Sequence, residues 1–89
     1  MASDIERFIR IEREVKAKWS AIPLGEKVRV WEMSSAVSDE GEPLRLFHIG
    51  HLETVARGQR VKYLGNTFAI ISVSDSKRLV GLELNCRGQ

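Results

Sequence analysis

The sequence predicts an α+β domain, in which one N-terminal amphipathic helix packs on a bent antiparallel β-sheet of about five strands. Apolar residues recur at helical spacing over about residues 3–21. From Lys27 onward the pattern changes to short runs rich in β-branched and aromatic residues, separated by turn residues. A length of 89 residues suits one domain, so we expect residues 1–89 to form a single unit.

The expected helix begins at a capping box, in which Ser3 and Glu6 satisfy each other's backbone amides. Its apolar residues fall in one broad arc of a helical wheel: Ile5, Phe8, Ile9, Ile11, Val15 and Trp19. Acidic residues precede basic ones by four positions at Glu6–Arg10, Glu12–Lys16 and Glu14–Lys18, which is typical of a solvated helix face. Pro23 ends the helix, because the residue before a proline disfavours helical geometry.

A β-meander is expected over about residues 27–85, and its first part is a long hairpin. Val28–Met33 and Leu44–Ile49 form the two strands, and the polar, acidic segment 38–43 forms the tip. The alternation of apolar residues shifts phase within Val28–Met33, which indicates either burial on both faces or a β-bulge. Residues 50–58 fit a strand or a single helical turn, and we favour the strand.

The second hairpin is marked by Gly65-Asn66, a pair suited to a tight turn with positive φ. It joins Gln59–Leu64 to Thr67–Val73, with Tyr63 placed opposite Phe68. A final strand is expected over residues 79–84, followed by a polar tail over residues 86–89. A small SH3-like or OB-like barrel satisfies this pattern, and so does an open sheet that dimerises through one face.

The segment Thr67–Val73 is apolar on both of its faces. One face packs on the core, and the second carries Ala69, Ile71 and Val73. An exposed apolar sheet face is a liability in a monomer. We therefore take Ala69, Ile71 and Val73 as a candidate protein interface.

Positive charge is concentrated in the second half of the chain. Residues 1–44 carry seven basic and nine acidic side chains, whereas residues 45–89 carry seven and three, so the halves have net charges of −2 and +4. If the last three strands are neighbours, several basic residues form one patch that attracts phosphate groups: Arg57, Arg60, Lys62, Lys77 and Arg78.

The sequence offers no convincing catalytic or metal-binding signature. His48 and His51 are three residues apart, so on one strand they point to opposite faces. His51 and Glu53 share a face, but a zinc site needs at least three protein ligands. An enzyme would need these two residues in a compact pocket with a third polar group. We expect no catalytic residue, no metal and no cofactor.

Composition suggests a cytoplasmic protein. The single cysteine, Cys86, provides no internal disulfide, the charged beginning of the chain does not resemble a signal peptide, and the longest apolar run is residues 68–71. We therefore expect no membrane segment and no small-molecule substrate.

Two functions follow as hypotheses. The first is a small non-enzymatic protein-interaction module that self-associates or binds another protein, because a chain of this length buries a small core. The alternative is a nucleic-acid-binding module that uses the basic C-terminal half.

Overall fold

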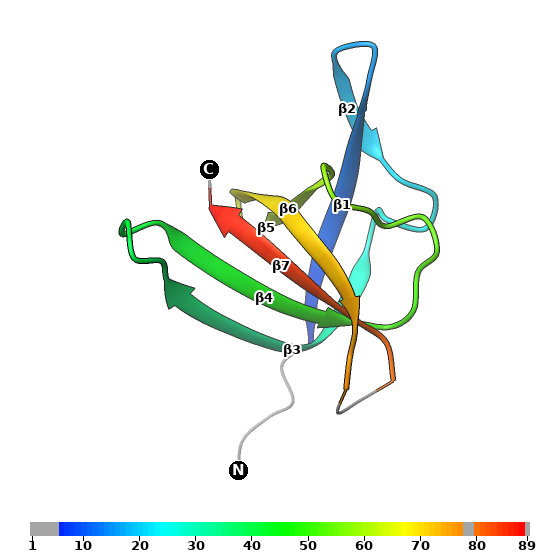
Figure 1. Cartoon of the computed structure of the whole chain (residues 1–89). Helices are drawn as coiled ribbons and strands as arrows, with labels where there is room; N and C mark the ends of the chain where they lie inside the picture. The colour runs from blue at the N-terminus through cyan, green and yellow to red at the C-terminus, as the bar shows by residue number, and fades with distance from the viewer. Residues whose placement is uncertain (1–5, 78–79, 89) are drawn as a thin grey trace.

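The computed structural model describes residues 6–77 and 80–88, and within these ranges every regular element is a β-strand (Figure 1). The strands of the described chain are β1 (Arg7–Val15), β2 (Lys18–Ala21), β3 (Val28–Val37), β4 (Pro43–Ile49), β5 (Arg60–Tyr63), β6 (Asn66–Asp75) and β7 (Leu82–Gly88). The predicted α+β class is therefore wrong, and the protein is an all-β domain.

The strands of the described residues form one antiparallel sheet that closes into a six-stranded barrel. The order around the wall is β1-β3-β4-β7-β6-β5, and β5 pairs with β1 to complete the ring. Closure removes the free edges of the wall. The alternative of an open sheet of about five strands is thus overturned, and the barrel has one strand more than an OB-fold.

The N-terminal helix expected over residues 3–21 is replaced by β1 and β2, and its capping residue Ser3 lies outside the described residues. Ile9 and Ile11 are almost completely buried inside the barrel. They share this face because alternate residues of a strand point to the same side. The chain reverses at Lys16 and Ala17, whose φ angles are 53° and 63°. Tertiary pairing of β1 with β3 and β5 overrides the local helical pattern, and β-branched isoleucines suit a pleated strand.

The core lies inside the barrel and is built around Phe47. Its ring makes edge-to-face contacts with Tyr63 and Phe68, with centroids 5.8 Å apart in each case. Such pairs add about 0.5–1.5 kcal/mol beyond the area they bury. Cys86 is also buried here, on β7. The predicted polar tail over residues 86–89 is therefore wrong, because β7 continues to Gly88.

Both predicted hairpins are present, with changes in detail. The β3–β4 hairpin has the expected acidic tip. A bulge between Val30 and Glu32 explains the phase shift in its first strand, as one of the two alternatives, burial on both faces or a bulge, had predicted. In the β5–β6 hairpin, Leu64 and Gly65 form the turn and Val61 stands opposite Phe68, two residues from the expected register. Residues 50–59 form a loop with turns rather than the expected strand.

Candidate functional site

A two-stranded arm projects from the barrel wall at the top of Figure 1. Beyond Glu12, β1 pairs with β2 alone among the described strands, and residues 13–20 form this β1–β2 arm. Val15 is 50% exposed, and the arm also carries three basic side chains and one acidic one, so its net charge is +2: Arg13, Lys16, Lys18 and Glu14. An isolated two-stranded hairpin is at best marginally stable in water. The arm is therefore the least supported regular element of the described chain.

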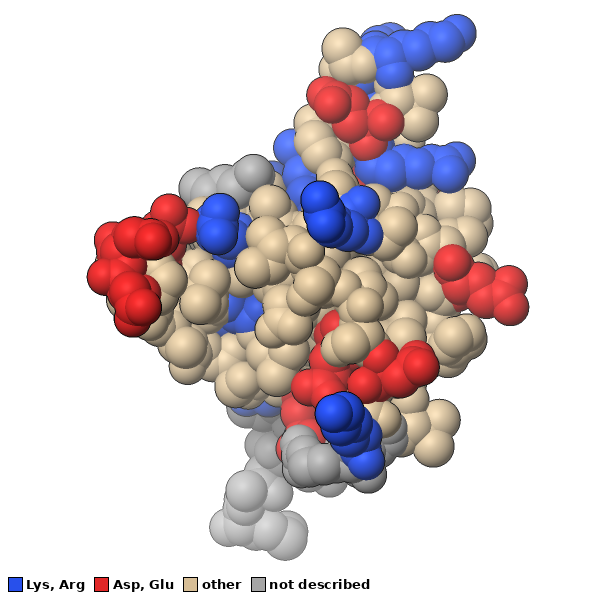
Figure 2. All heavy atoms as spheres, viewed as in Figure 1, with Lys and Arg blue, Asp and Glu red and all other residues tan. Residues whose placement is uncertain are grey.

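A shallow groove lies on the outer face of the sheet where β3, β4, β7 and β6 run side by side. Its volume is about 350 Å³, and its lining combines the apolar side chains of Leu44, Leu46 and Ile71 with Arg45 and small polar residues. In Figure 2 the face over these strands is mostly free of charged side chains. We call this surface the outer groove.

The acidic tip of the β3–β4 hairpin borders the outer groove. Ala36 and Leu44, which pair directly, line the groove one residue from the turn that carries Asp39 and Glu40. Figure 2 shows this acidic cluster at the left, whereas basic side chains gather on the arm at the top. Glu42 is held by Arg87, with Oε2 and Nε 2.7 Å apart. The two projections of the molecule thus carry charges of opposite sign.

The structure separates the three residues of the predicted interface. A bulge between Ile70 and Ser72 changes the alternation of β6, so Val73 turns inward and packs against the core. Ile71 is 38% exposed and lines the outer groove, while Ala69 is half-buried beside Arg87. Ile71 alone of the three belongs to the groove. The sequence analysis missed Leu44 and Leu46, whose apolar character was the available signal.

The predicted basic patch is also divided. Arg60 and Lys62 lie side by side with β1, opposite Glu12 and Arg10, and Arg57 precedes them in the loop. Lys77 follows the far end of β6, eight residues beyond Ala69, which pairs with Arg60. At about 3.3 Å per residue this places Lys77 roughly 25 Å away. Arg78 lies outside the described residues.

Glu12 organises the basic residues that remain together. It is 7% exposed, and its two carboxylate oxygens accept hydrogen bonds from Nε of Arg10 and Nε of Arg60, each at 2.7 Å. Burial raises the pKa of Glu12, but the hydrogen bonds and positive charges of the two arginines outweigh burial, and the net pKa is lowered from 4.5. The carboxylate fixes both guanidinium groups along the outer face of the wall.

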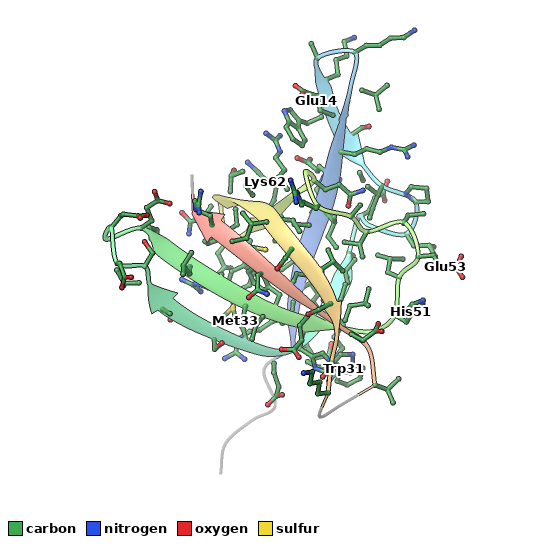
Figure 3. The ribbon with its side chains drawn as sticks, in the orientation of Figure 1. Glu14, Trp31, Met33, His51, Glu53 and Lys62 are labelled. Carbon is green, nitrogen blue, oxygen red and sulfur yellow. The ribbon has the colours of Figure 1, made fainter. Side chains whose placement is uncertain are left out.

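The two histidines lie in different surroundings. His48 is 5% exposed and stands between Glu32 and Glu83, its direct partners on β3 and β7. His51 and Glu53 are exposed on the loop after β4 (Figure 3). Among residues 6–77 and 80–88, no three His, Cys, Asp or Glu side chains converge in a way that would hold a metal ion.

Comparisons with known proteins give no relative to guide interpretation: no family model, no curated protein and no solved structure matches this chain. Within the described residues, no helix is long and apolar enough to cross a membrane. The arm, the outer groove and the charged faces are the surface features that bear on function.

Proposed function

We propose that this protein is a non-enzymatic interaction module that self-associates, with the β1–β2 arm of one copy lying in the outer groove of the next. One observation carries the proposal: the arm and the groove are complementary in chemistry. The arm presents exposed Val15 among basic residues, and the groove presents Leu44 and Ile71 beside the acidic tip. Apolar contact supplies affinity, and opposite charges steer association and suppress wrong orientations.

The arm needs a partner for a physical reason. Its β2 strand forms one edge of the described sheet, where backbone donors and acceptors are available to a further molecule. A hairpin that rests on the barrel at one end gains stability when a second surface covers it. The outer groove of another copy offers an apolar floor for that purpose.

Two kinds of assembly satisfy this contact. Two copies can exchange arms about a twofold axis, so that each arm lies in the groove of the other copy and a closed dimer results. Without that axis each contact leaves one arm and one groove unused, and the assembly grows into a ring or a filament, depending on the rotation between copies.

Light scattering coupled to size-exclusion chromatography tests the proposal at micromolar concentration and two salt concentrations. We expect species larger than a monomer that dissociate when salt is raised, because charge contributes to the contact. The double variant Lys16→Glu/Lys18→Glu and the double variant Asp39→Lys/Glu40→Lys should each be monomeric. A monomeric wild-type protein at low salt would refute self-association.

Mixing the two charge-reversed variants provides the decisive control. In the mixture, the acidic arm of one variant meets the basic tip of the other, and the basic arm meets the acidic tip. Complementary charge is restored at both contacts, so we expect the mixture to assemble although neither variant does alone. Assembly of the wild type with no recovery in the mixture would show that a different surface mediates association.

A further inference from the structure

Cations and aromatic rings alternate along the outer face of β1. Arg29 lies over the ring of Trp31, with its guanidinium carbon 4.2 Å from the centroid, and Lys27 Nζ lies 4.4 Å from the centroid of Phe8. At the other end of the strand, the guanidinium carbon of Arg60 is 4.3 Å from the ring centroid of Trp19. Proteins average about one such contact in 70–80 residues. Three in one row of the described chain therefore mark a specialised surface, which we call the β1 track.

Strand pairing makes the β1 track continuous. Phe8 stands directly opposite Arg29, Arg10 opposite Lys62 and Glu12 opposite Arg60, and these side chains alternate with the buried Ile9 and Ile11. From Phe8 to Glu14, which faces Trp19, the strand advances six residues, or about 20 Å. The row thus extends from Trp31, beside Arg29, to Trp19 in the arm.

The track carries a net positive charge. Its five cations are Arg10, Lys27, Arg29, Arg60 and Lys62, and its carboxylates are Glu12 and Glu14, so its net charge is +3. Glu6 lies beside one end of the track, 3.9 Å from Arg29. Because Glu12 is shared by two arginines at 2.7 Å, it orders these cations more than it neutralises the surface.

Trp31 is the most accessible ring of the track. It occupies the β-bulge between Val30 and Glu32, which removes it from the regular alternation and leaves it 54% exposed. Beside it is a groove of about 240 Å³, whose lining includes Gly50 and His51, and Figure 3 shows Trp31 and His51 near each other. Arg29 lies over one face of the indole, and both Arg29 and Trp31 line this groove.

We propose that the β1 track is a binding site for single-stranded nucleic acid, in which bases stack on Trp31 and Trp19 and phosphates contact the cations between them. Single-strand binders combine a positive groove along the backbone with aromatic stacking platforms. A duplex hides its base faces, so it can use the cations but not the rings. A track of about 20 Å suits a short site of about four nucleotides, the lower end of the range for small barrels. Trp19 belongs both to the arm and to the track, but the other members of the track lie outside residues 13–20 except Glu14, and single-strand binding is measured independently of self-association.

Fluorescence anisotropy with a labelled oligothymidylate of about 15 nucleotides, and with a duplex of equal length, tests the proposal at 50 and 200 mM salt. If four cations contact phosphates, a plot of log affinity against log salt concentration has a slope of about −2.8. The affinity should therefore fall about 50-fold between the two salt concentrations. The single strand should bind more tightly than the duplex. Absence of binding at about 50 mM salt would overturn the proposal.

Variants separate stacking from charge. Trp31→Ala should weaken single-strand binding at least fivefold without changing the salt slope, since stacking on one aromatic residue is of that order or larger. Trp31→Phe keeps a ring and should restore most of the affinity. Lys62→Gln should reduce the magnitude of the slope by about 0.7, because it removes one cation that contacts phosphate.

Two outcomes would point to another ligand. Equal binding of duplex and single strand that is insensitive to Trp31→Ala would reveal a general polyanion surface and refute the stacking site. Displacement of the oligonucleotide by an equal charge concentration of polyglutamate would assign the track to acidic peptides instead. Melting temperatures of all variants show whether a loss of binding reflects unfolding.

Discussion

Glu12 is the residue on which the outer wall depends most directly. It is almost fully buried, and it fixes Arg10 and Arg60 from two neighbouring strands of the described barrel. Glu12→Gln removes the negative charge and leaves two ordered guanidinium groups without their carboxylate. We expect a loss of about 1–3 kcal/mol in the free energy of unfolding, measured by urea denaturation at neutral pH. Glu14→Gln, at an exposed position on the same strand, should have little effect.

The lowered pKa of Glu12 also predicts an acid dependence. A carboxylate with a folded pKa below its unfolded value of 4.5 stabilises the protein above that pH, and the contribution is lost as pH falls through the folded pKa. Unfolding free energy should therefore decrease below about pH 4.5, and Glu12→Gln should show a shallower decrease. Equal pH dependence of the two proteins would contradict this role of Glu12.

Cys86 gives the corresponding prediction at high pH. Burial raises the pKa of its thiol from 9.0 to about 12, so the folded protein keeps the thiol protonated where the unfolded chain ionises it. Stability should be unaffected by this group below about pH 9 and should fall above it. At about pH 8, a thiol reagent should react slowly with native protein and rapidly in urea. Fast reaction without urea would show that β7 opens readily.

The first element shows why part of the fold could not be predicted from the sequence. The spacing of Phe8, Ile9 and Ile11 fits one face of a helix and also fits a strand. Acidic and basic residues four positions apart lie on the same side in either structure. The decisive facts are the pairing with Val61 on β5 and the reversal at Ala17, and neither leaves a local signal. Glycine or asparagine normally marks a turn with positive φ, and this turn contains neither.

Turn residues located both hairpins but not their details. The β3–β4 hairpin has the expected acidic tip, although β3 continues to Val37. Gly65 marks the β5–β6 turn, although the pairing differs by two residues from the predicted register. The predicted interface of Ala69, Ile71 and Val73 is divided by a bulge. The bulge beside Ile71 turns the side chain of Val73 towards the core. Clusters such as the β1 track depend on pairing between β1, β3 and β5, which periodicity within one strand does not reveal.

The turn of the arm allows a test at the level of an element. Ala17 has a φ of 63°, a conformation that costs a residue with a Cβ about 1 kcal/mol relative to glycine. Ala17→Gly should therefore stabilise the arm by about that amount, seen as slower hydrogen exchange of amides across the β1–β2 pairing. Gly41→Ala, at a φ of +84° in the β3–β4 turn, is the reciprocal control and should destabilise its hairpin. Faster exchange in Ala17→Gly would mean that the arm does not adopt this turn.

Closure of the barrel is the property that belongs to the whole molecule. The closing ladder joins residues some fifty positions apart, and its central pair is Ile11 opposite Val61. Both side chains are fully buried. Pairing over such a sequence distance is entropically costly before it is formed, so we expect the closing contact to be made together with the core and not ahead of it.

A double-mutant cycle across the closing ladder tests whether β1 and β5 are paired in the folded protein. Ile11→Val should cost about 0.5–1.5 kcal/mol in unfolding free energy, because it leaves a small gap in the barrel interior. Val61→Ala acts on the side chain directly opposite, so the combined loss should depart from the sum by at least 0.5 kcal/mol. Leu46 lies on the outer groove, across the wall from the core, and Ile11→Val combined with Leu46→Ala should be additive. Additivity of the Ile11 and Val61 changes would show that β1 and β5 are not paired in solution, and that the barrel is open at this seam.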